Sequence, residues 1–99
     1  MSTMRNSVML IGRPTDNPTI NDNNASFDLL VVEKTMNKTT QEWETDIQSF
    51  RCISVCKPVT DRISNYVRKG LQLAIDGKLK RVDNDVVIVI GELFLIDRP

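Results

Sequence analysis

The sequence contains no histidine, only two cysteines and only four isolated glycines among its 99 residues. The commonest general base and the commonest metal ligand are therefore missing, and two cysteines alone cannot complete a four-ligand zinc site. No glycine-rich phosphate loop follows a strand, and the acidic residues lack the paired spacing on one element that a hydrolase needs. We therefore expect no catalytic residues, no metal and no cofactor, and the protein is not predicted to be an enzyme.

Net charge and long apolar runs are also missing. Thirteen basic and thirteen acidic residues give a formal net charge of zero, which argues against a polybasic surface but allows local basic patches. No apolar run approaches the length that spans a membrane, and the N-terminus has no apolar signal region. Cys52 and Cys56, on one predicted strand, would have Cα atoms about 13 Å apart, beyond the reach of a disulfide. The sequence predicts a cytoplasmic protein with free thiols and no membrane partner.

The residues that are present divide into strand-like and helix-like segments. Runs rich in Val, Ile, Leu and Phe predict strands at residues 8–11, 26–34, 46–57, 71–80 and 86–96. Apolar residues at three-to-four spacing predict one helix over residues 59–70, with Gly70 at its end. Gly91 interrupts the last strand, at a position suited to a bulge. Residues 14–25 are expected to form a loop, and residues 35–45 a long loop or a hairpin tip.

This element order predicts a fold class. With 40% apolar residues the chain can build one core, so a single domain over residues 1–99 is expected. Five strands and one helix in a chain of this size can remove their edges by closing into a barrel, which is the architecture of the oligonucleotide/oligosaccharide-binding (OB) fold. We therefore predict an all-β, five-stranded OB-fold barrel with one short helix between strands 3 and 4. A flat α+β sandwich has the same element order and remains the alternative.

Alternation along the third strand predicts which side chains face a ligand. Ile53 and Val55 share one side with Arg51 and Lys57, and two β-branched residues in mid-strand favour that side as the core. Phe50 would then face outward, where an aromatic ring can stack on a nucleobase with about 1–3 kcal/mol per base. The alternative is that Phe50 covers a partner subunit or lies half-buried.

Basic residues are spread along the chain, after the first strand, on the third strand and at the end of the helix, and several of them project toward the two hairpins that wrap the binding groove of an OB barrel. They are Arg13, Lys34, Lys38, Arg51, Lys57, Lys69, Lys78, Lys80 and Arg81. The acidic residues mostly fall elsewhere, although a solvated face of mixed charge is the alternative reading. Trp43, the only tryptophan, lies in a polar segment, where it either binds a ligand or packs back on the barrel.

Four motifs resemble those of bacterial and phage-type single-stranded DNA-binding proteins. The stretch "NSVMLIGRPTDNP" at residues 6–18 resembles the opening of the family, and "SFDLLVVEK" at residues 26–34 its second strand. The stretch "YVRKGLQLAIDGKLKR" at residues 66–81 is similar to the family pattern around the fourth strand, and "VVIVIGELFLID" at residues 86–97 to the closing strand. The similarity spans residues 5–97 with the four motifs in the right order.

The resemblance implies an OB fold that assembles as a homo-oligomer, a tetramer being favoured over a dimer, with single-stranded DNA wrapped over basic channels. Phe50 takes the place of a stacking tryptophan, whereas Cys56 takes the place of a stacking phenylalanine. Two further family aromatics fall near Thr35 and Val82, so DNA binding would rely more on the cations. Family members recruit replication and repair proteins through an acidic C-terminal tip, whereas this sequence stops at "LIDRP", so the resemblance does not extend to those partners.

Together these observations predict a protein that coats and protects single-stranded DNA, without strong sequence preference, during replication, recombination and repair. Such binding combines electrostatic contacts with stacking and weakens with salt. The alternatives are a primosome-type accessory OB protein and an OB protein–protein interaction module with weak binding to single-stranded DNA. An oligosaccharide-binding barrel would need more clustered aromatic residues than this sequence contains.

Overall fold

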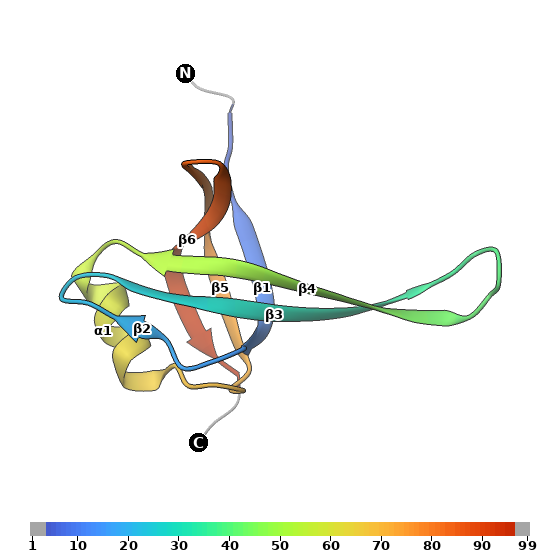
Figure 1. Ribbon diagram of the computed structural model, residues 1–99, viewed down its shortest axis with the longest axis horizontal. Helices are drawn as coiled ribbons and strands as arrows, with labels where there is room; N and C mark the ends of the chain where they lie inside the picture. The colour runs from blue at the N-terminus through green and yellow to red at the C-terminus, as the bar shows by residue number, and fades with distance from the viewer. Residues whose placement is uncertain (1–3, 97–99) are drawn as a thin grey trace.

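The computed structural model describes residues 4–96, which form six strands and one helix (Figure 1). The elements are β1 (Val8–Pro14), β2 (Thr19–Ile20), β3 (Ala25–Met36), β4 (Trp43–Ser54), α1 (Lys57–Tyr66), β5 (Leu73–Val82) and β6 (Asp85–Leu95). All five predicted strands are present. The parts of the predicted domain before residue 4 and after residue 96 lie outside the described residues.

Five of the strands close into a barrel. The strand order is β1–β5–β6–β4–β3, and β3 pairs back to β1, where Arg13 lies opposite Leu30. The pairs are antiparallel except for β4 and β6, which run parallel with Cys52 opposite Ile88. This mixed closed barrel confirms the predicted OB fold, since closure removes the sheet edges.

The sixth strand corrects the expectation that residues 14–25 form only a loop. Thr19 and Ile20 pair with Ser26 and Ala25 of β3, outside the barrel. The segment is rich in Pro and Asn, which disfavour strands. A strand of only two residues, paired to the side of β3, nevertheless fits between these Pro and Asn residues. Because of this extra strand, the helix follows the fourth strand of the structure rather than the third.

The helix closes one end of the barrel and buries Val59 and Ile63 in the core. Figure 1 shows α1 at the end opposite to the long β3–β4 hairpin. It begins at Lys57, earlier than predicted, because Pro58 suits the first turn of a helix. It ends at Tyr66, and Gly70 takes a φ of 84° in the following turn rather than directly capping the helix.

The predicted orientation of the third sequence segment, now β4, was wrong. Cys52 and Ser54 are buried, whereas Arg51 and Val55 are exposed. The reason is a hydrogen-bonded network: the hydroxyl groups of Ser54 and Thr60 lie 2.6 Å apart, and the Ser54 hydroxyl also accepts the Ala25 N–H at 3.0 Å. Buried polar groups are tolerated when their hydrogen bonds are made. Small side chains on β4 therefore face the core.

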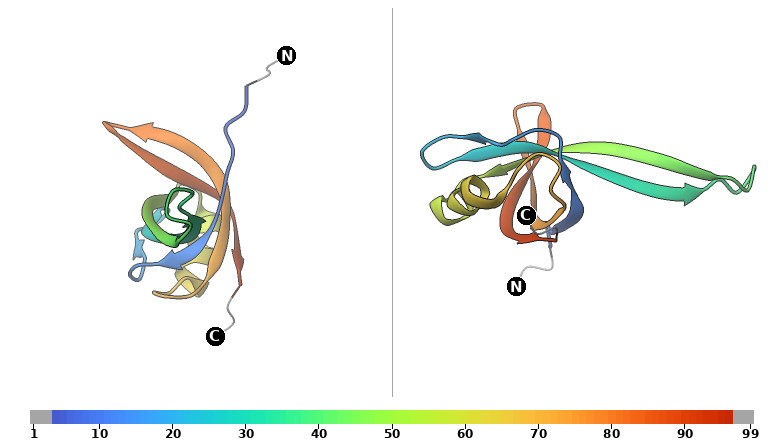
Figure 2. Two further views of the ribbon diagram at one scale, coloured as in Figure 1. Left: turned by 90° about the vertical axis from the view of Figure 1, so that its right-hand side faces the viewer. Right: turned by 90° about the horizontal axis from the view of Figure 1, so that it is seen from below.

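The β3–β4 hairpin extends far beyond the barrel as a two-stranded ribbon (Figure 1; Figure 2). We refer to its projecting part, residues 32–47, as the arm. The register runs without interruption to the pair Met36–Trp43, so Trp43 lies on a strand and not in a loop as predicted. At the tip the Asn37 side chain accepts the N–H groups of Thr39 and Thr40, which fixes the turn. The β5–β6 hairpin leaves the barrel in a different direction (Figure 2).

The bulge predicted at Gly91 is confirmed. Asp76 lies opposite Glu92 and Gly77 lies opposite Ile90, so Gly91 is the extra residue on β6. The strands approach closely next to it, because a Cβ atom on Gly77 would lie 2.1 Å from the Val89 carbonyl oxygen. Only glycine fits position 77 without moving the backbone of β6.

We expect Gly77→Ala to lower the free energy of unfolding by roughly 1–3 kcal/mol or more, because the new methyl group meets a backbone carbonyl that cannot move alone. Gly91→Ala is the matched control, since a Cβ there has only one ordinary contact, 3.4 Å from the Asp76 carbonyl oxygen. It should change stability by less than about 1 kcal/mol. Urea denaturation of both variants measures the difference, and equal stabilities would contradict the close approach at Gly77.

Candidate nucleic-acid interface

The outer side of the barrel is hollowed where the base of the arm meets the β5–β6 hairpin. This first hollow has a volume of about 590 Å³. It is lined by Asp28, Ser49, Arg51, Val82, Asp83, Asp85, Val86 and Val87. The face of the second and third strands of an OB barrel, together with the loop of the last hairpin, is where such barrels take oligonucleotides. The hollow therefore lies where a strand of nucleic acid is expected.

The charge of the first hollow is mixed. The Nε atom of Arg51 lies 3.3 Å from a carboxylate oxygen of Asp28, and both side chains are largely exposed. Two further acids, Asp83 and Asp85, belong to the turn of the β5–β6 hairpin. Arg51, which was predicted to contact DNA, is thus in the groove but already has an acidic partner. Its contribution to binding a phosphate is correspondingly reduced.

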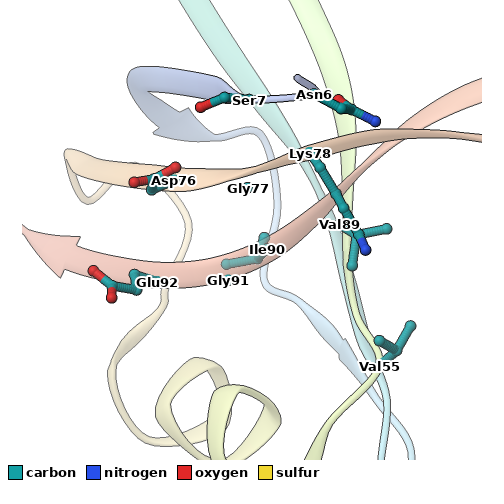
Figure 3. A pocket seen from close by; sticks show the side chains of 10 residues that line it. All are labelled: Asn6, Ser7, Val55, Asp76, Gly77, Lys78, Val89, Ile90, Gly91 and Glu92. Atoms are coloured by element: carbon teal, nitrogen blue, oxygen red, sulfur yellow. The ribbon is translucent and has the colours of Figure 1, made fainter. Parts of the chain in front are cut away.

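A second hollow of about 580 Å³ continues along the outside of β5 and β6 (Figure 3). Its lining includes Val55, Lys78 and Val89, together with the acidic residues Asp76 and Glu92. Figure 3 shows the Lys78 side chain lying along Val89 and away from Asp76 and Glu92. A lysine stem on an apolar surface keeps its ammonium group in water. This end of the site combines apolar side chains with one cation and two carboxylates, so its charge is mixed as well.

The N-terminal segment is fixed beside this hollow by Asn6. Its side-chain amide donates to the Leu79 carbonyl at 2.7 Å and accepts the Leu79 N–H at 2.8 Å. With these two bonds the Asn6 side chain pairs with the backbone of β5 in the way that a neighbouring strand would. Asn6, the first residue of the motif identified in the sequence, therefore has a structural role.

The structure brings together only some of the predicted cations. Lys78 and Lys80 project from one face of β5, opposite Val89 and Val87, while Arg81 alternates to the other face. Lys78, Lys80 and Arg51 line the outer side of the barrel between the two hairpins. Three other predicted residues are carried away from it by the arm: Lys34, Lys38 and Trp43.

The remaining predicted cations lie near the ends of α1. Arg13 donates to the Gly70 carbonyl at 2.6 Å, and the Lys69 N–H donates to the Asn17 side chain at 2.9 Å. Lys57, at the start of the helix, lies 3.6 Å from a carboxylate oxygen of Asp61. The sequence placed Lys69 near the end of the helix, as the structure does, whereas Lys57, predicted at the end of a strand, begins the helix. Whether these three residues contact DNA stays a prediction.

Phe50 does not face outward as predicted. It lies opposite Leu29 on the inner side of β4, is half-buried and packs against the core. The same side carries Cys52, where burial, with a smaller contribution from the Asp28 charge, raises the pKa of the thiol to about 12. Both cysteines are free thiols, as predicted, and Cys56 is exposed. Whether Phe50 contacts DNA stays a prediction.

The groove has an apolar component that the sequence did not reveal. Val55, Val82 and Val86 are each about half exposed on or beside the hollows. Val86 is not distinguishable in the sequence from its neighbours in β6, because Val87 to Ile90 are all buried and the period-2 signal is lost. Val55 was assigned to the core by the wrong orientation of β4. Within residues 4–96 no three His, Cys, Asp or Glu side chains gather as metal ligands, and the described helix is too short to cross a membrane.

A closed five-stranded barrel with an end helix and a hollow between two hairpins defines an OB-fold domain of the nucleic-acid-binding type. Comparison with known families agrees: the pattern of the Single-strand binding protein family matches residues 5–86. The chain belongs to this family and is a single-stranded DNA-binding protein.

Solved structures show the same fold. The chain is similar to the Plasmodium falciparum SSB, solved in complex with ssDNA, with a TM-score of 0.85 and 24% identity over 98% of this chain and 99% of that chain. A small single-stranded DNA-binding protein from Streptomyces coelicolor gives a TM-score of 0.71 and 14% identity over 94% and 95% of the two chains. A deletion mutant of the Thermus aquaticus protein gives 0.74 and 13%, over 94% of this chain and 51% of that chain. Among curated proteins no match was found.

The packing of Phe50 leads to a test that separates stability from binding. We expect Phe50→Ala to lower the free energy of unfolding by roughly 1–3 kcal/mol, since the half-buried ring contacts the core. Phe50→Leu keeps an apolar side chain there and is expected to stay folded while losing the aromatic ring. If Phe50 stacks on a base, the Leu variant binds an oligonucleotide more weakly, by about 1–3 kcal/mol. An unchanged affinity of the folded Leu variant would remove Phe50 from the interface.

Proposed function

We propose that this protein coats single-stranded DNA without sequence preference and protects it during replication, recombination and repair, with no catalytic activity. The observation that carries the proposal is the outer face of the β5–β6 hairpin. There Lys78 and Lys80 are exposed opposite the buried Val89 and Val87, and the exposed side chains of Val55, Val82 and Val86 lie on or beside the adjoining hollows. Cations that follow a backbone, combined with apolar surface for bases, give binding that is tolerant of sequence.

The similarity to a protein solved with ssDNA supports the same conclusion. The cations that we assign to DNA contact first are those on the outer side of the β5–β6 hairpin and on the arm: Lys34, Lys38, Lys78 and Lys80. Arg81, on the opposite face of β5, is assigned after them. A strand would reach Arg13, Lys57 and Lys69 only by wrapping around the helix end of the subunit. Few aromatic side chains are available to stack, so we infer that electrostatic contacts dominate the affinity.

We also propose that the protein is a homo-oligomer. The outer face of β1, β5 and β6 carries exposed apolar side chains in adjacent rows, with Ile11 opposite Ala74 and Ala74 opposite Phe94. Ile11 on β1 and Phe94 on β6 are 51% and 49% exposed, and Met9, 67% exposed, lies in the neighbouring row opposite Asp76. Contiguous apolar surface of this kind marks a protein interface, and a second copy of the chain is the simplest partner. A tetramer is favoured over a dimer by the family resemblance, and the cytoplasm is the expected compartment.

One observation favours a second candidate function. Asp28, Asp83 and Asp85 line the first hollow and disfavour phosphate there. An OB-type accessory protein, which binds a protein partner and holds single-stranded DNA weakly, would be compatible with this charge. Contacts with replication and repair proteins would then be the main activity.

Fluorescence anisotropy of a labelled poly-dT oligonucleotide tests DNA binding. We expect tight binding at low salt that unlabelled duplex DNA does not displace. Three phosphate contacts would lower the affinity roughly twentyfold between about 50 and 200 mM salt, because counterions are released on binding. Absence of binding at the lower salt concentration would exclude the main proposal and favour the accessory-protein candidate.

Analytical ultracentrifugation tests the oligomer. We expect the wild-type protein to sediment as an oligomer and Ile11→Lys to sediment with a lower mass, because the new charge would lie in the apolar interface. Ile20→Lys is the matched control, since Ile20 is an exposed isoleucine on β2 away from that face. A wild-type mass equal to that of one chain, or an equal effect of both substitutions, would contradict the interface.

A further inference from the structure

The end of β6 is a sheet edge that no other described strand covers. β4 pairs with β6 only at Ile88 and Val89, and beyond this point β4 gives way to α1. On its other side β6 pairs with β5 as far as Leu95. We refer to residues 91–95 as the β6 edge. Within residues 4–96 no strand pairs with the side of this edge that faces away from β5.

The direction of the backbone groups on the β6 edge follows from two hydrogen bonds. The Ile96 N–H donates to the Gln72 carbonyl, on the β5 side, at 3.0 Å. Because the backbone groups of successive residues alternate in direction along a strand, those of Leu95 and Leu93 point away from β5. The Leu93 carbonyl agrees, since it accepts a bond from the Arg62 side chain of α1 at 3.0 Å. The N–H groups of Leu93 and Leu95 therefore face the open side of the edge.

A third hollow, of about 360 Å³, lies between the β6 edge and the helix. It is lined by Pro58, Val59 and Arg62 of α1 and by residues 91–94 of β6, among which the Phe94 side chain is 49% exposed. PDZ and PTB domains take an extended peptide at a free strand edge, where main-chain bonds give affinity and pockets read alternate side chains. The β6 edge beside an apolar hollow has both of these components.

Arg62 adds a charge to this hollow. Its guanidinium carbon lies 5.8 Å from the centre of the Tyr66 ring, and no ion pair within residues 4–96 involves it. The neighbouring Asp61 lies instead 3.6 Å from Lys57. A guanidinium with N–H groups to spare binds a carboxylate strongly. Glu92 also lines the hollow, from the same face of β6 as Phe94, and disfavours a second carboxylate on that face.

We propose that the β6 edge binds an extended segment of a partner protein as an added strand. A carboxylate of the segment lies on Arg62, and an apolar side chain covers Phe94. Since successive side chains of a strand point to opposite sides, the segment alternates acidic residues toward α1 with apolar residues toward the outer face. The site shares Gly91 and Glu92 with the second hollow but none of the cations assigned to DNA, so it goes beyond the proposed function and does not depend on it.

The rival reading is that Arg62 protects the edge. Bulges and charged side chains guard free strand edges against pairing with a second copy of the chain, and the β6 edge has the bulge at Gly91. The exposed ring of Phe94 and the hollow beside it argue against a closed edge, because a guarded edge needs no apolar hollow.

A labelled peptide of about ten residues in which Val and Asp alternate provides the test. Fluorescence anisotropy should show saturable binding with a Kd below about 1 mM, and the same peptide with Lys in place of Asp should not bind. N-methylation of the backbone is applied to the Val positions or to the Asp positions. Because an added strand uses the N–H groups of one of its sides only, we expect one set of methyl groups to abolish binding and the other set to preserve it.

Two arginines provide matched variants. Arg68 follows the helix, donates to the carbonyls of Ser64 and Val67, and does not line the hollow. We expect Arg62→Gln to weaken peptide binding about tenfold, the loss of a charge-assisted hydrogen bond, and Arg68→Gln to change it by less than about twofold. Arg62 is preferred to Phe94 for this test because Phe94 also belongs to the proposed oligomer interface.

Two further measurements locate the peptide and separate this site from DNA binding. Amide hydrogen exchange of Leu93 and Leu95 should slow when the peptide is added. The affinity of Arg62→Gln for poly-dT should stay within about twofold of the wild type, so a failure of DNA binding would leave the peptide site standing.

Three outcomes would overturn the peptide site. They are equal effects of the two arginine substitutions, binding that survives both sets of methyl groups, and binding without protection of the Leu93 and Leu95 amides. Absence of peptide binding would overturn it as well. If Arg62→Gln then sedimented with a higher mass than the wild type, Arg62 would be assigned to protecting the edge from a second copy.

Discussion

Closure of the barrel is the constraint on which the rest of the structure depends. It is achieved by two short contacts, since β1 meets β3 over only two residue pairs and β4 meets β6 over only two. The first contact is possible because Gly12 has no side chain: a Cβ atom there would lie 2.3 Å from the Leu30 carbonyl oxygen. Because both contacts are short, the strands are free to diverge on either side of them. The long hairpins are a consequence of this divergence.

Where β3 and β4 leave the barrel, the side of each strand that was buried in the core becomes exposed to solvent. Along β3 the buried residues alternate from Ala25 to Val31, and the same alternation then continues into solvent as Glu33 and Thr35. The change from apolar to acidic residues on one side of a strand therefore marks where the barrel ends and the arm begins. A free two-stranded ribbon is marginally stable, so its cross-strand pairs matter. The pairs Val32–Ile47 and Met36–Trp43 supply apolar contact on the other side, which carries Lys34 and no acidic residue.

The sequence alone was sufficient for the order of the five barrel strands along the chain, the end helix and the bulge at Gly91, because each has a local signal in spacing or residue type. It failed at β4, where small side chains are buried. Ser54 is core only because Thr60 of the helix and the Ala25 N–H complete its hydrogen bonds, and those partners are distant in sequence. Trp43 was assigned to a loop because an arm with two solvated faces shows no apolar alternation at all. The candidate cations Lys78 and Lys80 followed from strand alternation, whereas the position of Arg13 beside Gly70 depends on barrel closure and has no local signal.

A chain with no net charge can bind a polyanion only if its charges are sorted in space. The sorting in this protein is done by strand alternation rather than by blocks in the sequence. On β5, Lys78 and Lys80 share a face with Val87 and Val89 of β6, and on the arm Lys34 and Glu44 are on opposite faces although their rows are adjacent. Since every second residue of a strand points the same way, a register shift of one residue would mix the two signs. The hydrogen-bond register of the hairpins therefore maintains the electrostatic surface as well as the fold.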